Sequence, residues 1–145
     1  MLRAENLPRA AVHVRVTVAN QKIDFYSIHL GVFSPLDRSN QVEDLHNFVE
    51  DTQLPGSPII IVGDFNDLPN TTLYDSVLAG GYVDTWVESG NTLNSSSGYT
   101  YDSYVPYETI DYIFTSPDIS TGTFIVMTEQ HGSDHLPIYV DLIIP

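Results

Sequence analysis

The chain has 145 residues, of which 42% are hydrophobic and 11% aromatic, so we expect one globular domain over residues 1–145 rather than a disordered segment. It contains no cysteine, which excludes disulfides and thiolate metal sites. The net charge of −14 disfavours tight binding to a polyanion such as duplex DNA unless cations intervene.

No apolar run approaches the roughly 18 residues that a membrane helix requires. Residues 1–16 lack an apolar stretch followed by a small-residue cleavage site, so no signal peptide is recognisable in them. We therefore expect a soluble protein without a membrane span, and its compartment is left open.

The first predicted elements form a β-hairpin. Valines alternate with other residues over 10–18, the pattern of a half-buried strand. The segment NQK follows as a turn, and IDFYSIHL over 23–30 is the second strand. Apolar residues then recur at three- and four-residue spacing from Val42 to Val49, with acidic residues between them, which predicts a helix over 37–52.

A strand at the centre of the sheet is predicted at 59–62. Its four consecutive β-branched residues are typical of a strand that is buried on both faces. A short helix should follow within 70–81, capped by Asn70 or Thr71 and ended by Gly80.

The polar, tyrosine-rich segment 88–108 is predicted to be a long loop, and loops of this length inside compact domains are often functional. Three further strands are predicted over residues 109–116, 122–129 and 136–144. Strands interrupted by two helices indicate an α/β fold, with a sheet covered by helices.

Polar residues gather where the predicted strands end, and ligands of α/β sheets bind beyond such ends. The candidates are His29, Asp64, Asn66, Asp111, Asp134 and His135. Each also has an ordinary interpretation as a turn residue, a half-buried histidine or a solvent-facing acid. If Asp111 is buried it needs a partner, and a histidine would serve. The remaining histidines, His13, His46 and His131, are interpreted as surface or strand residues.

Taken together, these segments resemble the endonuclease/exonuclease/phosphatase superfamily, which includes deoxyribonucleases, abasic-site endonucleases, sphingomyelinases and inositol phosphatases. GDFN (63–66) and SDHLP (133–137) match its signatures letter for letter, IDYI (110–113) matches a third, and SIHL (27–30) matches more loosely. The motifs extend over residues 9 to 143. The resemblance implies the C-terminal half of a four-layer α/β sandwich, with a mainly antiparallel or mixed sheet covered by helices on one face.

The resemblance also implies a divalent-metal site holding Mg²⁺ or Mn²⁺. Asp134 resembles a metal-ligating carboxylate, and Asp64 resembles the residue that orients or deprotonates the attacking water and touches the metal. Asn66 resembles the amide that helps to hold that water and a phosphate oxygen. Carboxylate and amide oxygens are hard ligands that suit either ion.

The imidazoles receive separate roles from the same resemblance. His135 resembles the group that stabilises the phosphorus transition state, and Asp111 resembles its hydrogen-bonded orienting partner. His29 resembles a second imidazole that donates to a phosphate oxygen or protonates the leaving group. An Asp–His pair of this kind fixes the tautomer and supports the charged imidazole.

The chain departs from the family pattern in two places. No strand before residue 10 supplies the family's metal-binding glutamate, and Glu5 is not assigned that role. Glu108 and Thr109 stand where the family often has a basic residue. Half of the sandwich would also leave one apolar sheet face in water, so we expect a homodimer or pairing with a chain that carries the N-terminal half.

The predicted function is divalent-metal-dependent hydrolysis of a phosphoester, with the enzyme competent only when the missing half is present. A small or lipid-like substrate suits the acidic charge better than nucleic acid. The alternative is a non-catalytic folded module or partner-binding half-domain that lacks the main metal-ligand glutamate.

Overall fold

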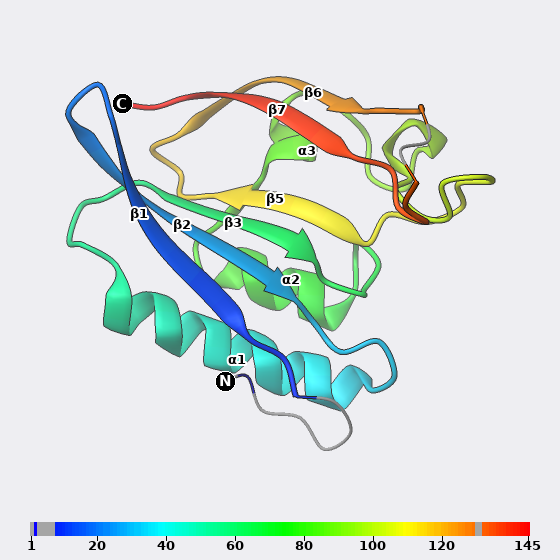
Figure 1. Ribbon diagram of the computed structural model, residues 1–145, viewed down its shortest axis with the longest axis horizontal. Helices are drawn as coiled ribbons and strands as arrows, with labels where there is room; N and C mark the ends of the chain where they lie inside the picture. The colour runs from blue at the N-terminus through cyan, green and yellow to red at the C-terminus, as the bar shows by residue number, and fades with distance from the viewer. Residues whose placement is uncertain (1, 3–7, 130–131) are drawn as a thin grey trace.

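The computed structural model describes residues 2, 8–129 and 132–145, and a five-stranded mixed sheet lies at its centre (Figure 1). The strand order is β1-β2-β3-β5-β4, and a separate antiparallel pair, β6-β7, packs on one face of this sheet. The strands are β1 (Ala11–Val18), β2 (Gln21–His29), β3 (Ile59–Asp64), β4 (Val83–Asp84), β5 (Asp111–Thr115), β6 (Ser120–Val126) and β7 (Ile138–Ile143). The expected α/β class with a mixed, mainly antiparallel sheet is confirmed.

The predicted hairpin of β1 and β2 is present, with a tighter turn than the sequence suggested. Val18 pairs directly with Gln21, so only Ala19 and Asn20 lie between the strands. Both have positive φ, at 50° and 71°, which is the backbone of the two-residue turns that fit the twist of a hairpin. The second strand consequently begins at Gln21 rather than at residue 23.

Two helices cover one face of the central sheet. Helix α1 (Pro35–Thr52) begins two residues before its predicted start, because Pro35 is compatible with a first helical turn and the Ser34 side chain caps the Asp37 N–H. Helix α2 (Thr72–Ala79) is capped by Thr71. The core under these helices contains Tyr26, Ile28, Leu30, Val42, Leu45, Val49, Ile61, Phe65, Leu73, Tyr74, Val77, Tyr112 and Phe114.

Besides the three-residue 3₁₀ helix η1 (Ser96–Gly98), two short elements were not predicted, namely strand β4 and helix α3 (Thr85–Glu88). Both are too short to show a hydrophobic period. Asp84 defines them instead, because its buried carboxylate accepts hydrogen bonds from the Trp86 N–H at 2.8 Å and from the Tyr74 hydroxyl at 2.8 Å. A capping interaction therefore fixes α3 where sequence periodicity gives no signal.

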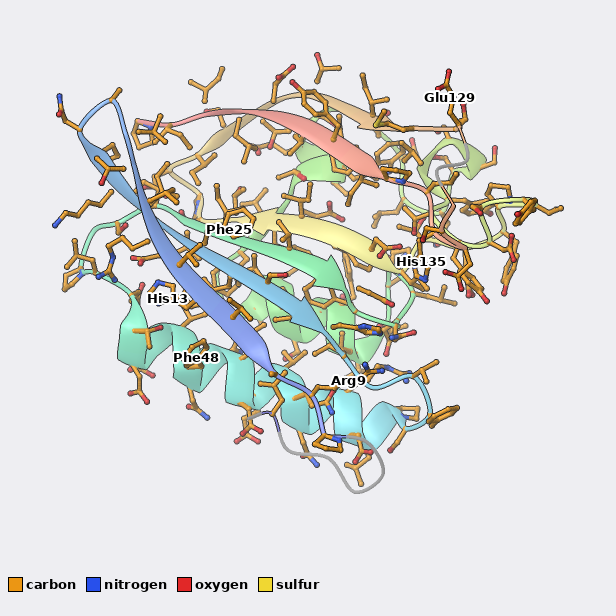
Figure 2. All side chains as sticks on the ribbon, viewed as in Figure 1. Arg9, His13, Phe25, Phe48, Glu129 and His135 are labelled. Carbon is orange, nitrogen blue, oxygen red and sulfur yellow. The ribbon has the colours of Figure 1, made fainter. Side chains whose placement is uncertain are left out.

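The opposite face of the sheet packs against β6 and β7. A second apolar cluster joins Ile23, Ile60 and Ile113 to Ile119, with Phe25 among the half-buried residues beside it. In Figure 2, Phe25 lies on this face, whereas His13 and Phe48 lie on the face toward α1.

The cover provided by β6 and β7 does not extend over β1. Four valines of β1 point to this face and remain exposed, and they are called the valine stripe below: Val12 (59%), Val14 (47%), Val16 (42%) and Val18 (52%). Within the part of the chain that the structure describes, no helix is long and apolar enough to cross a membrane.

Strand β3 lies between β2 and β5 and brings residues of all three strands into register at one end of the sheet. It runs parallel to β2 and antiparallel to β5, which pairs His29 with Asp64 on one side and Asp64 with Asp111 on the other. Gly63 makes this close pairing possible, because a Cβ at that position would lie 1.9 Å from the Ile28 carbonyl oxygen. Its φ of 146° is also one that residues with side chains rarely adopt.

Candidate active site

An open pocket of about 740 Å³ lies beyond the ends of β2 and β3. The structure brings all six candidate residues to its walls, although they come from four separate segments of the chain. They are His29, Asp64, Asn66, Asp111, Asp134 and His135. The parallel pairing of β2 and β3 and the antiparallel pairing of β3 and β5 account for the first four.

Asp64 is the central carboxylate of the pocket, with a side chain only 15% exposed. Its Oδ2 lies 3.3 Å from His29 Nε2 and 3.9 Å from His135 Nε2. Burial raises the pKa of Asp64, and the hydrogen bond from the Asn66 backbone N–H at 2.7 Å opposes that rise. The neighbouring charge of Asp111 adds to it, so the pKa of Asp64 stays above its usual value.

Asn66 forms a tight turn directly after β3. Its φ is 51°, a left-handed conformation that asparagine tolerates better than most residues. The side-chain Nδ2 donates to the Leu30 carbonyl at 3.0 Å and to Asp64 Oδ2 at 3.3 Å. The amide group therefore has a defined orientation at the wall of the pocket.

His135 and Asp111 form a hydrogen-bonded pair. Nδ1 of His135 lies 2.8 Å from Oδ2 of Asp111, which leaves Nε2 directed toward Asp64. Burial lowers the pKa of His135, but the hydrogen bond and charge of Asp111, with the charges of Asp64 and Asp134, outweigh burial and raise that pKa. The pair thus favours a charged imidazole at the site.

Asp134 lies in an exposed turn that is bonded to a neighbouring loop. Its carbonyl oxygen accepts from the Ser103 N–H at 2.8 Å, and the Ser103 hydroxyl donates to the Ser133 carbonyl at 2.7 Å. Among the described residues, Asp64, Asp111 and His135 place ligand atoms within 4.8 Å of one another. Asp134 is outside this close group, on the wall of the same pocket.

The pocket contains four further polar or aromatic residues that were not among the predicted site residues, namely Arg9, Tyr101, Tyr107 and Glu108. The Tyr101 ring lies 5.0 Å from the His135 ring and 5.6 Å from the Tyr107 ring, measured between centroids. Three of the four belong to the long loop 88–108, whose length was the available signal. Arg9 precedes β1 and gave no signal.

Two of the remaining histidines, His13 and His46, do not line the pocket and pack elsewhere in the fold. His13 stacks on Tyr26 with 4.6 Å between ring centroids, and its Nε2 lies 2.7 Å from Asp24 Oδ1. His46 is half-buried, and burial lowers its pKa. His131 and Glu5 lie outside the described residues.

A mixed sheet whose strand ends place carboxylates, two imidazoles and an amide around one open pocket is typical of the class of α/β proteins that carry acid–base groups at an active site. Comparison with known proteins makes the class specific. The chain belongs to the endonuclease/exonuclease/phosphatase family, whose model matches residues 4–135. No curated protein matches it in sequence.

Solved structures share the fold. A mannosyl-6-phosphatase of Bacteroides thetaiotaomicron superposes with a TM-score of 0.79 at 21% identity, over 95% of this chain and 58% of the phosphatase chain. The catalytic domain of human Nocturnin with a bound sulfate has a TM-score of 0.75 at 21% identity, over 94% and 53% of the two chains. Humanized D. rerio TDP2 has a TM-score of 0.73 at 20% identity, over 93% and 61%.

The chain therefore spans about half to three fifths of the length of these structural relatives. At such identities the likeness establishes the phosphoesterase fold of the family.

Proposed function

We propose that the chain supplies the catalytic half of a divalent-metal-dependent phosphoester hydrolase. One observation carries the proposal: Asp64, Asn66, Asp111, His135 and His29 meet in one open pocket of a chain that belongs to a phosphoesterase family. Hydrolysis of a phosphoester requires a base for water, donors for the phosphate oxygens and relief of negative charge, and these side chains provide the first two.

Asp64 acts as the general base in this proposal. A raised pKa makes the Asp64 carboxylate a stronger base than an ordinary aspartate. The Asn66 backbone N–H fixes Oδ1, which holds the carboxylate in one orientation. Oδ2 faces the two imidazoles across the pocket.

The two histidines donate hydrogen bonds to the substrate. Asp111 binds Nδ1 of His135 and so directs the Nε2–H into the pocket, where it stabilises the negative charge that develops on the phosphoryl oxygens. His29 is the more accessible imidazole, with a side chain 55% exposed, and it suits protonation of the leaving group.

The residues present fit a divalent cation. The carboxylates of Asp64 and Asp111 are crowded into a half-buried space, where burial and, to a lesser degree, the charge of Asp111 raise the pKa of Asp64, and a cation would offset the contribution of that charge. Asp64, Asp134 and the Asn66 amide oxygen are hard ligands that would hold Mg²⁺ or Mn²⁺. When bound, such an ion polarises the phosphoryl group and offsets its negative charge.

We infer that the substrate is a small phosphoester rather than a polynucleotide. The chain has 19 acidic residues against five lysines and arginines, and such a balance repels an extended polyanion. The half-buried Tyr101 ring and the exposed Tyr107 ring form a tyrosine wall of the pocket, which suits an organic group attached to a single phosphate.

The test is hydrolysis of p-nitrophenyl phosphate and bis-p-nitrophenyl phosphate with Mg²⁺ or Mn²⁺. Asp64→Asn and His135→Ala should each lower turnover about 100-fold or more. Asp118→Asn is the matched control, because Asp118 is an exposed carboxylate in the turn between β5 and β6. Equal rates in wild type and all three variants would exclude catalysis by this chain on its own. Metal binding without turnover would favour the alternative of a non-catalytic module.

We also infer that the valine stripe is covered by further polypeptide in the active protein. The structural relatives carry chain beyond the matched part, and the match covers only 58% of the phosphatase chain. A row of exposed valines beside the half-buried Phe25 is an apolar surface of the kind that proteins cover. The occupant is a segment like the unmatched part of the relatives, and a second copy of this chain is the competing outcome.

A further inference from the structure

Arg9 is the one lysine or arginine among the described residues that line the pocket, so its positive charge does not depend on protonation of an imidazole. Its Nε is buried and has no hydrogen-bond partner. Buried polar atoms in folded proteins are almost always bonded, so this nitrogen marks a guanidinium that is not committed to another described residue, and Arg9 lines the open pocket where a ligand can reach the side chain. A guanidinium is a donor only, and the ligand must therefore be an acceptor.

The other described basic residues are committed elsewhere. Arg15 donates to Asp24 at 2.8 Å. Arg38 donates to Asp67 at 2.9 Å and to two backbone carbonyls at the start of the loop before α1. Lys22 lies beside the hairpin turn, at the opposite end of β2 from His29. None of these three lines the pocket.

The hairpin register explains how Arg9 reaches the site. Ala11 pairs with Ile28, so Arg9 lies just beyond the strand pair, next to the end of β2 that carries His29. Figure 2 shows Arg9 at the start of β1 and His135 beyond the start of β5, at the same end of the strands of the sheet. Glu108 also lines the pocket, yet no described carboxylate pairs with the Arg9 guanidinium.

We propose that Arg9 is the anion-recognition residue of this site, binding the unesterified oxygens of the substrate's phosphate. The proposal rests on the proposed function and deepens it. Arginine presents a planar fork of donors that matches two phosphate oxygens at once, which a lysine ammonium does not. Arg9 therefore replaces the basic contact that is absent at Glu108 and Thr109.

With Arg9 in this role, the pocket has a cationic wall and an aromatic wall. The guanidinium lies at one wall, and the rings of Tyr101 and Tyr107 form another. A substrate with an anionic phosphate and a compact organic group suits both walls. A phosphomonoester has one more free oxygen than a diester, so it gains more from a bidentate donor.

The first experiment measures binding rather than turnover. Phenylphosphonate, which cannot be hydrolysed, is titrated calorimetrically into the 145-residue protein and its variants, with and without Mn²⁺. Arg9→Gln should weaken binding about tenfold or more, and Arg9→Lys should recover only part of the loss. Lys22→Gln is the matched control, since it removes the same charge at the exposed hairpin end, and its affinity should stay within about twofold of wild type.

Several outcomes would overturn the assignment. They are wild-type affinity in Arg9→Gln, equal losses in Arg9→Gln and Lys22→Gln, full recovery with lysine, and no binding of phenylphosphonate by the wild type. Thermal unfolding of each variant checks that the fold is retained. If Arg9→Gln does not fold, Arg9→Lys keeps the positive charge and decides the question through its affinity.

Kinetics separate this proposal from the proposed function. With p-nitrophenyl phosphate, Arg9→Gln should raise KM about tenfold and change kcat much less, because the contact exists before the transition state as well as in it. If Arg9→Gln turns over the substrate with the KM of wild type, the assignment of Arg9 is wrong and the proposed hydrolase function stands. If phosphonate binding depends on Arg9 but no variant or wild type shows turnover, the proposed hydrolase function is wrong and Arg9 stands as an anion-binding residue.

Discussion

Asp64 and Asp111 are direct partners across the antiparallel pair of β3 and β5. Two carboxylates in that relation repel each other, and the repulsion adds to burial in raising the pKa of Asp64. The His135 imidazole lies between them, 2.8 Å from one carboxylate and 3.9 Å from the other. One imidazole therefore contacts both acids, with a hydrogen bond to Asp111 and a longer charge contact with Asp64.

The role of Asp111 can be tested through the titration of His135. In the metal-free protein, Asp111→Asn removes the hydrogen-bonded charge, so burial should dominate and the pKa of His135 should fall relative to wild type. NMR titration of the imidazole measures this directly. Phosphoester turnover should fall about 100-fold in the same variant. An unchanged His135 titration would show that Asp111 does not orient or charge the imidazole.

The close approach of β2 and β3 depends on Gly63. Gly63→Ala places a methyl group against the Ile28 carbonyl at a φ of 146°, so the free energy of unfolding should fall by about 2 kcal/mol or more. Gly31→Ala is the matched control, since its Cβ would meet only the Gln41 side chain, at an ordinary 3.5 Å. Denaturant unfolding compares the two, and equal stabilities would contradict the steric argument.

Asp24 should make stability depend on acid pH at a place remote from the pocket. Burial alone would raise its pKa, but hydrogen bonds from Leu54 N–H, His13, Arg15 and Ser57 lower the pKa below 3.8. A folded pKa below the unfolded one gives stability that is complete above about pH 4 and is lost as pH falls through the folded pKa.

Asp24→Asn should therefore cost about 2 kcal/mol of unfolding free energy at pH 7. The difference from wild type should shrink as pH falls below about 4. Urea unfolding from pH 7 to pH 2 checks both statements. A difference that stays constant over this range would mean that the charge of Asp24 contributes nothing.

The valine stripe should control association. In size measurements at micromolar concentration, the 145-residue chain should associate or aggregate, and replacing Val14 and Val16 by lysine should return it to a well-folded monomer. Buried valines of α1, on the other side of the sheet, supply the control: Val42 and Val49 belong to the core and should unfold the protein when replaced in the same way. A stable wild-type monomer would contradict the inference that this surface needs a cover.

Much of the fold could be predicted because its larger elements carry clear periods. The valines of β1, the β-branched run of β3 and the apolar spacing of α1 each indicate their element without help from the rest of the chain. Helix α3 could not be found this way, because it has four residues and depends on the buried carboxylate of Asp84.

The candidate site divides along similar lines. Residues inside short motifs, such as Asp64 and His135, were found because the motif itself joins residue type to a strand end. Arg9 could not be found, since its place in the pocket depends on the hairpin register and on what its guanidinium fails to contact. Tertiary pairing, rather than local sequence, decides such positions.

The two isolated β-bridges of Tyr101 limit how the loop at the pocket can be redesigned. Its backbone pairs with Glu108 within its own loop and with His135 in the next, so the tyrosine wall and the imidazole are fastened to each other. A redesign of the loop to accept a bulkier leaving group would also displace His135, the imidazole that we assign to the phosphoryl oxygens. A change in substrate selectivity made in the Tyr101 loop should therefore also change the rate, and a library that randomises this loop should include the turn that carries His135.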